Sequence, residues 1–227
     1  MKKLLLVSFL LTFLWARRSN AQEQFVSGSV LNQKSVRFNV GTQGIGAEFG
    51  YGVLPKLALR FGADFIPVSA NNVFAISDFN STSKLSAKFS NIHLLADYIP
   101  FESALGFRLV GGAAYFVKAR GHLEVKPTDE YKYGDIILNP DEVGKLDMNV
   151  TWKGVAPYLG IGLLKAFPNR AFNVNLDVGT YYLRHPDATV AGTGILEGNS
   201  SQSAQLQSNV KNYRFLPVVQ VNFNFKL

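Results

Sequence analysis

The chain has 227 residues, of which 47% are hydrophobic and 17% are charged, against about 25% charged in a typical soluble domain. This composition argues against a disordered chain, and the length suits one sizeable domain. The chain contains no cysteine and only three histidines, so disulfides, thiolate catalysis, iron–sulfur clusters and cysteine-ligated zinc are excluded. We therefore expect neither a cofactor nor a metal site.

The N-terminus has the organisation of a secretory signal peptide. Two lysines precede an apolar run over residues 4–15, and a small-x-small cleavage site ends directly before Gln22. We expect residues 1–21 to be removed and residues 22–227 to form a single domain. Removal takes away four of the 23 basic residues and leaves 19 against 16 acidic ones, so the net charge falls from +7 to +3. This balance argues against a nucleic-acid partner, and an exported chain without cysteine fits a bacterial envelope.

From residue 34 onward, every second residue is apolar in a series of long runs. Such alternation indicates strands with two chemically different faces. The runs predict eight strands, over residues 34–40, 44–53, 57–65, 89–98, 106–119, 146–164, 172–182 and 213–227. The alternation shifts phase within the sixth run, and a β-bulge near Lys153 and Gly154 would absorb the extra residue.

The connections between these strands alternate in length. Three are short and three are long and polar: 54–56, 100–105 and 165–170 against 68–86, 120–145 and 184–211. Antiparallel neighbours joined in this order place the short turns at one end of a barrel and the long loops at the other. The sequence therefore predicts an all-β fold, an eight-stranded antiparallel up-and-down transmembrane β-barrel with short periplasmic turns and three long extracellular loops. Residues 200–211 predict a short helix with a serine N-cap.

The bulk of the apolar side chains indicates which face points inward. The interior of an eight-stranded barrel is only just wide enough to be filled by side chains or by one small ligand. The apolar face carries most of the 18 phenylalanines and 9 tyrosines, which is too much for that space. The opposite face mixes glycines with long charged residues, a combination that can pack a narrow lumen.

Charged residues that leave water for such a lumen must pair, because an isolated buried charge is strongly destabilising. We therefore expect a structural network that plugs the lumen in preference to a conducting path. Its predicted members carry both signs and are Glu48, Arg60, Asp64, Asp97, Arg108, Lys118, Asp177 and Arg214.

Three stretches resemble known proteins. Residues 41–62 (GTQGIGAEFGYGVLPKLALRFG), 142–163 (EVGKLDMNVTWKGVAPYLGIGL) and 215–227 (FLPVVQVNFNFKL) are similar to the small outer-membrane β-barrel proteins of Gram-negative bacteria, the broad OmpA/OmpW-like superfamily. The resemblance implies a location in the outer membrane, surrounded by lipid and lipopolysaccharide, and we expect a barrel of this size to be a monomer. It also implies recognition of the C-terminal strand by the barrel-assembly machinery, although the chain ends in Leu227 where that signal has an aromatic residue.

Candidate catalytic and ligand-binding residues are few. Ser90, His93 and Asp97 form the best local trio for a hydrolase, but Ser90 and His93 point to opposite faces of a strand and His93 and Asp97 lie ~13 Å apart. Lys118, Arg120 and Arg184, near the ends of the long loops, are candidates for contacts with lipopolysaccharide phosphates. Five acidic loop residues are candidates for a divalent cation, although interleaved lysines favour a solvated loop: Asp129, Glu130, Asp135, Asp141 and Glu142.

These observations favour an integral outer-membrane barrel that is not an enzyme and has a structural or interaction role through its extracellular loops. Two alternatives belong to other classes. One is a secreted soluble barrel that binds a hydrophobic small molecule, and the other is a barrel-embedded lipid-modifying enzyme.

Overall fold

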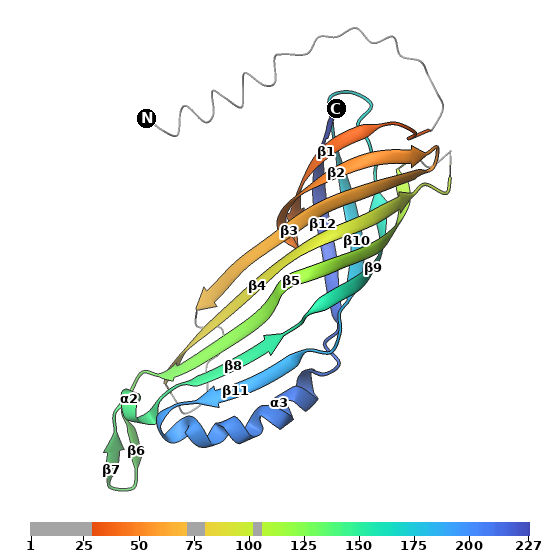
Figure 1. Cartoon of the computed structure of the whole chain (residues 1–227). Coiled ribbons are helices and arrows are strands. Elements are labelled where there is room, and N and C mark those ends of the chain that lie inside the picture. The colour runs from red at the N-terminus through yellow and green to blue at the C-terminus, as the bar shows by residue number, and fades with distance from the viewer. Residues whose placement is uncertain (1–28, 72–79, 102–105) are drawn as a thin grey trace, which may run out of the picture.

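The computed structural model describes residues 29–71, 80–101 and 106–227 (Figure 1). The predicted signal peptide, residues 1–21, lies outside the described residues, as do parts of the predicted connections 68–86 and 100–105. Within the described residues, no helix is long and apolar enough to cross a membrane.

Eight antiparallel strands form a closed ring. They are β1 (Lys34–Gly41), β2 (Gly44–Leu54), β3 (Leu57–Asn71), β4 (Ser81–Tyr98), β5 (Phe107–Pro127), β9 (Gly154–Leu163), β10 (Phe172–Tyr182) and β12 (Phe215–Lys226). Each strand from β1 to β5 pairs with the next one along the chain, and β5 pairs with β9. The ring continues through β10 and β12, and β12 pairs with β1 from Ser35↔Lys226 to Gly41↔Gln220. The run 34–40 therefore supplies the strand that closes the barrel.

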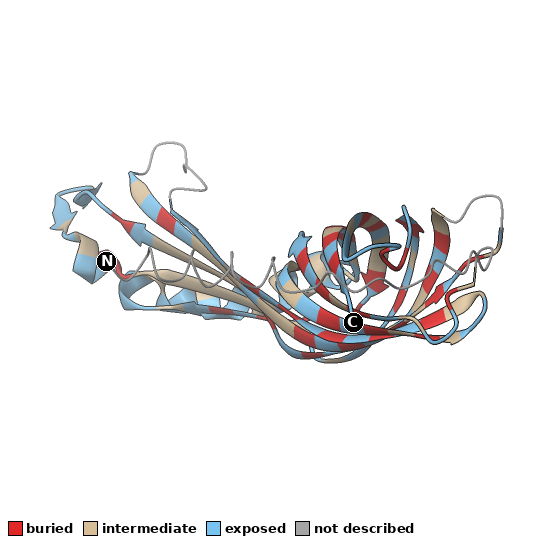
Figure 2. Cartoon of the chain, turned by 90° about the horizontal axis from the view of Figure 1, so that it is seen from above, coloured by how far each residue is buried: buried red, intermediate tan, exposed pale blue. Residues whose placement is uncertain are grey.

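Side chains alternate between the inside and the outside of this ring, because successive residues of a strand point to opposite faces. Figure 2 shows the result as alternating buried and exposed stripes along the ring strands. Leu94 is 54% exposed, whereas its neighbour His93 is 2% exposed. The outward positions of β9, from Val155 to Leu163, are all apolar.

We call the exposed, outward-facing apolar side chains of the ring the apolar band. It comprises Phe38, Val40, Ile45, Phe49, Leu59, Phe61, Phe65, Ile92, Leu94, Leu109, Tyr115, Val117, Val155, Leu159, Ile161, Leu163, Phe172, Val174, Val178, Val219, Phe223 and Phe225.

The connections sort to the two ends of the ring as their lengths predict. Pairs such as Leu57↔Tyr98, Phe107↔Leu163 and Phe172↔Phe225 place the β2–β3, β4–β5 and β9–β10 connections at the end that also carries the C-terminus. We call it the turn end, and the opposite end the loop end. A two-residue turn at Thr42 and Gln43 joins β1 to β2 at the loop end.

Beyond the ring, several strands continue at the loop end as an open sheet (Figure 1). The pairing of β5 with β9 stops at Gly154, the first residue of β9. Farther along, β5 pairs with β8 (Leu146–Thr151), and β8 pairs with β11 (Asp187–Gly192). We call the part of β3, β4 and β5 beyond the ring, together with β8 and β11, the loop-end sheet. A hairpin of β6 (Tyr131–Tyr133) and β7 (Ile136–Leu138) and the short helix α2 (Pro140–Val143) lie at its tip.

The loop-end sheet corrects two expectations. All three segments predicted as long loops, 68–86, 120–145 and 184–211, contain strand residues. In 68–86, β3 continues to Asn71 and β4 begins at Ser81. The alternation continues in these segments with polar residues outside. The run 146–164 is not one bulged strand but two, β8 and β9, separated at Trp152 and Lys153. Gly154 begins β9 at φ +96°, a left-handed conformation that favours glycine.

A helical segment covers the edge of β11. It consists of the 3₁₀-helix η1 (Gly194–Gln202) and the α-helix α3 (Ser203–Val210), so the helix predicted over 200–211 begins earlier and has no serine N-cap. Gln207 accepts a hydrogen bond from the Ala188 N–H at 2.7 Å and donates one to the Pro186 carbonyl at 2.7 Å. Ser203 Oγ accepts from the Val190 N–H at 3.0 Å. These side chains satisfy edge groups that would otherwise be free to pair with another strand.

Adjacent alanines on β5 test the assignment of the two faces. Ala113 lies opposite Leu94 on the outside, and Ala114 lies opposite His93 and is 2% exposed. In reconstituted vesicles of Ala113→Cys, we expect the thiol to take a nitroxide label that is accessible to a lipid-soluble quencher. The thiol of Ala114→Cys should react only after unfolding. The absence of native cysteine makes both signals specific, and the opposite pattern would invert the faces.

Candidate functional site

The centre of the barrel holds charged side chains of both signs. They come from the inward positions of six ring strands, and each is at most 4% exposed: Arg37, Glu48, Arg60, Asp64, His93, Asp97, Arg108 and Asp177. We call this set the interior network. Strand alternation alone points these residues inward, so their convergence follows from closure of the ring.

Two arginines and two aspartates form the middle of the network. Arg60 contacts Asp177 Oδ2 at 2.7 Å and Asp97 Oδ1 at 2.9 Å. Arg108 contacts the other oxygens of the same carboxylates, Asp97 Oδ2 at 3.0 Å and Asp177 Oδ1 at 2.8 Å. Each carboxylate therefore lies between two guanidinium groups, and Arg60 also reaches Glu48 Oε2 at 3.2 Å. Guanidinium groups suit this arrangement because their planar donors match paired carboxylate oxygens.

Arg37 connects the network to the turn end. Its Nη2 lies 3.4 Å from Asp97 Oδ2 and donates to the Ala166 carbonyl at 3.0 Å. Its guanidinium carbon lies 5.7 Å from the centre of the Phe167 ring, within range of a cation–π contact. Ala166 and Phe167 belong to the β9–β10 connection, so this connection folds over the end of the lumen.

His93 and several amides complete the network toward the loop end. His93 lies 3.2 Å from Asp64 Oδ2 through Nδ1 and 3.3 Å from Glu48 Oε1 through Nε2. Gln220 donates to Glu48 Oε1 at 3.3 Å, and Asn222 donates to Asp177 Oδ2 at 2.9 Å. The amides give the carboxylates additional donors, which buried charges require.

Apolar side chains pack the lumen on both sides of the network. Toward the turn end these are Val30, Ala58, Ile99, Ala166 and Phe167. Toward the loop end they are Leu95, Val110, Ala114, Phe116, Ala119, Ala156, Tyr158, Tyr181, Leu183 and Val218. Between the network and the second cluster lies a cavity of about 10 Å³, roughly the volume that one water needs.

The structure brings six of the eight predicted network residues together: Glu48, Arg60, Asp64, Asp97, Arg108 and Asp177. Lys118 is not among them. The β4–β5 pairing passes from Asn91↔Phe116 to Ser90↔Lys118, so Val117 is an extra residue and Lys118 faces outward.

Arg214 also lies outside the network. It precedes β12, donates from Nε to the Leu183 carbonyl at 3.1 Å, and stacks 4.2 Å from the centre of the Tyr182 ring. The last run was predicted to start at residue 213, but the strand starts two residues later, at Phe215, so Arg214 is not part of it.

Sequence reasoning placed Arg37 and His93 on polar strand faces but omitted both from the network. The alternation that selected Arg60 applies equally to Arg37, so that signal was available. Of the hydrolase trio, His93 and Asp97 point into the lumen, whereas Ser90 shares the outward register of Phe65. The three side chains therefore do not form a triad.

The outer face changes character at the loop end. Lys88, Lys118 and Arg120 are exposed and face outward just beyond the apolar band, with Lys88 paired in register with Arg120. We call these three residues the cationic patch. Arg184 is exposed after the end of β10.

A second outward cluster lies farther along β5. Lys145 donates to Glu124 Oε2 at 2.9 Å and contacts Asp147 Oδ2 at 3.1 Å. The hydrogen bond from Lys145 lowers the pKa of Glu124, and the bond to Glu124 raises the pKa of Lys145. Among the described residues, His122, Glu124 and Asp147 form the one group whose ligand atoms could hold a metal ion.

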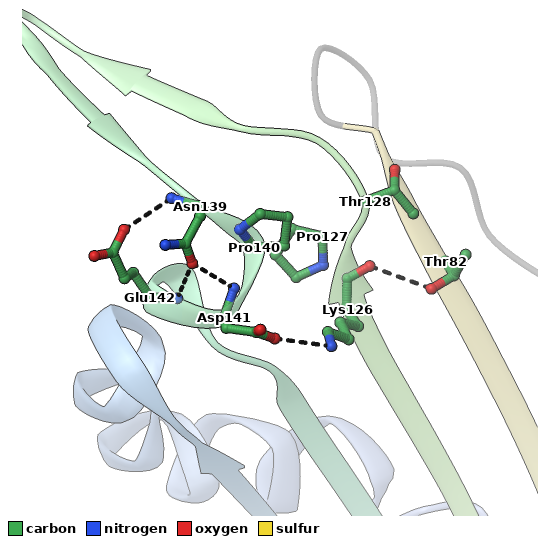
Figure 3. A pocket seen from close by; sticks show the side chains of 8 residues that line it. All are labelled: Thr82, Lys126, Pro127, Thr128, Asn139, Pro140, Asp141 and Glu142. Atoms are coloured by element: carbon green, nitrogen blue, oxygen red, sulfur yellow. Dashed lines mark hydrogen bonds and ion pairs between the residues drawn. The ribbon is translucent and has the colours of Figure 1, made fainter.

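An open hollow of about 730 Å³ lies at the tip of the loop-end sheet (Figure 3). Its polar groups bond to one another: Lys126 pairs with Asp141 at 3.1 Å, and the Asn139 side chain caps α2 by accepting from the Asp141 and Glu142 N–H groups. The carboxylates of Asp141 and Glu142 therefore bond to other residues that line the hollow, Lys126 and Asn139. In the part of the chain that the structure describes, the five acidic loop residues do not converge on one point.

Comparisons with known proteins bear on the fold. No protein-family model matches the chain, and no curated protein matches its sequence. The crystal structure of Acinetobacter baumannii CarO2 superposes with a TM-score of 0.63 at 21% identity, over 87% of this chain and 99% of that one. That of Acinetobacter baumannii CarO superposes with a TM-score of 0.60 at 24% identity, over 88% and 98%. Both are outer-membrane β-barrel proteins. The chain has the fold of an outer-membrane β-barrel. The resemblance in the sequence is confirmed at the level of the fold.

Proposed function

We propose that the chain is an integral outer-membrane barrel whose filled interior has a structural role and whose loop end makes the interactions. The observation that carries the proposal is the polarity of the barrel, which has charges at its centre and apolar side chains outside. Lipid is a suitable environment for such an exterior, because every backbone polar group of a closed ring is paired within the protein.

The alternative of a soluble carrier fits this polarity poorly. A carrier of hydrophobic molecules needs an apolar cavity inside the barrel, whereas this interior holds the interior network and a cavity of about 10 Å³. In water, the apolar band would form a continuous exposed surface of a size that monomeric soluble proteins rarely present.

The outward residues of β5 support a boundary between lipid and water at Val117. Up to this residue the outward positions include Leu109, Tyr115 and Val117, and beyond it they are polar or charged from Lys118 to Lys126. Nine residues beyond the boundary correspond to about 30 Å of strand. We propose that the loop-end sheet projects into the medium and is the surface available to partners, in a role that is not enzymatic.

Lipopolysaccharide and the assembly machinery are the partners that we propose for the barrel wall. The cationic patch lies where the phosphates of the outer leaflet would meet the protein, and lysine and arginine are good phosphate donors. In β12, the apolar residues at 219, 221, 223 and 225 share the outward face, which suits presentation of this strand to the assembly machinery. We propose that the barrel is a monomer.

Conductance tests the proposal of a filled lumen. Reconstituted into planar bilayers, the chain should carry no stepwise current at high salt, because the interior network and the apolar clusters leave no continuous aqueous path. A porin with a water-filled lumen is the positive control. Uniform steps with each insertion of this chain would contradict the filled interior, whatever the location of the protein.

Trypsin treatment of intact cells tests the location and the orientation. Lys132 in the β6–β7 hairpin and Lys211 after α3 are exposed at the loop end, whereas Lys165 and Arg170 are exposed at the turn end. We expect cleavage at the first pair on intact cells, and at the second pair only after the outer membrane is opened. Early cleavage at Arg170 on intact cells would reverse the orientation, and release of the protein into the periplasm would contradict membrane insertion.

A further inference from the structure

Four polar side chains occupy the corners of a small rectangle on the outer face of the loop-end sheet. His122 and Glu124 are two residues apart on β5, and they lie opposite Asn149 and Asp147 of β8 in register. All four share one face because alternate residues of paired strands point the same way. The proposed role of the barrel does not use this cluster.

Three of these residues have the spacing of metal ligands. Ligand atoms of His122, Glu124 and Asp147 all lie within 4.8 Å of one another. His122 Nε2 and Asp147 Oδ1 are 3.4 Å apart. Two ligands of a tetrahedral zinc ion, bound at ~2.1 Å, are separated by about 3.4 Å. This pair could therefore bind one ion with little movement.

The orientation of the histidine ring within this cluster suits a metal ligand. His122 Nδ1 lies 3.0 Å from Asn149 Oδ1, and an amide oxygen only accepts hydrogen bonds. Nδ1 therefore carries a proton, and Nε2 is the nitrogen that faces the carboxylates. Metal-binding histidines are held in this way, with the far nitrogen donating to an oxygen that fixes the ring.

Lys145 places its ammonium group between the two carboxylates of the cluster. Its ammonium nitrogen bridges Glu124 Oε2 at 2.9 Å and Asp147 Oδ2 at 3.1 Å. The Lys145 side chain is 42% exposed, and ion pairs at such exposure contribute little stability. A flexible side chain held this weakly can turn into solvent when another cation takes the two carboxylates.

We propose that His122, Glu124 and Asp147 form a binding site for a divalent transition metal of the zinc class. Asn149 positions the imidazole, and Lys145 competes with the metal for the carboxylates. One imidazole with two carboxylates favours zinc and its neighbours in the first transition row over magnesium and calcium, which prefer oxygen ligands alone.

Calorimetric titration of the untagged full chain in detergent micelles with zinc chloride tests the site. We expect one zinc ion per chain, with binding about tenfold or more weaker in His122→Ala and in Asn149→Ala. Lys145→Gln should bind zinc about two- to fivefold more tightly, because it removes a competitor worth at most a surface ion pair. A simple salt-bridge cluster predicts no such gain.

His185→Ala is the matched control, since His185 is an exposed histidine bonded only to the Lys211 carbonyl among the described residues. It should leave zinc binding unchanged. Each variant is first checked for folding by the shift in gel mobility between unboiled and boiled samples. Absence of zinc binding by the parent chain, binding that survives His122→Ala, or equal affinity for calcium would each overturn the proposal.

Discussion

Charged groups inside the barrel must satisfy one another, because neither lipid outside nor water inside is available to do so. Arg60 and Arg108 each contact both Asp97 and Asp177, so loss of any one of them leaves buried charge without a partner. These residues come from β3, β4, β5 and β10, and their contacts therefore require the correct register around the ring. The interior network, more than any single pair, ties the strands to one arrangement.

The outer surface must suit the medium around it, and its outward residues on β5 change from largely apolar to polar after Val117. Within the ring, most outward positions are apolar, which suits the lipid that we propose surrounds them. Beyond Val117 the strands continue, but their outward positions become polar, and the cationic patch and the rectangle around His122 both lie on that polar stretch. The same strands thus serve as a membrane wall and as a projecting sheet.

The two-residue period was sufficient to predict the ring strands, their inner and outer faces, and the six network residues that the structure brings together. It failed where one residue breaks the period. Val117 is an extra residue in the pairing of β4 with β5, so Lys118 points outward where strict alternation would point it inward. The break at Trp152 separates β8 from β9. The loop-end sheet was missed because its polar outward residues look like a loop when only apolar alternation is sought. The pairing of His122 with Asn149 depends on a register set across the 18-residue connection 128–145, which periodicity does not encode.

A double-mutant cycle on Arg108 and Asp177 tests most directly whether the interior network holds the barrel together. Their Nη2 and Oδ1 atoms are 2.8 Å apart. Urea unfolding in lipid vesicles should give a loss of about 3–5 kcal/mol for each of Arg108→Met and Asp177→Asn, because each leaves buried charge unpaired. The double variant should lose less than the sum, with a coupling energy of about 1–3 kcal/mol. Additive losses, within about 0.5 kcal/mol, would contradict the account.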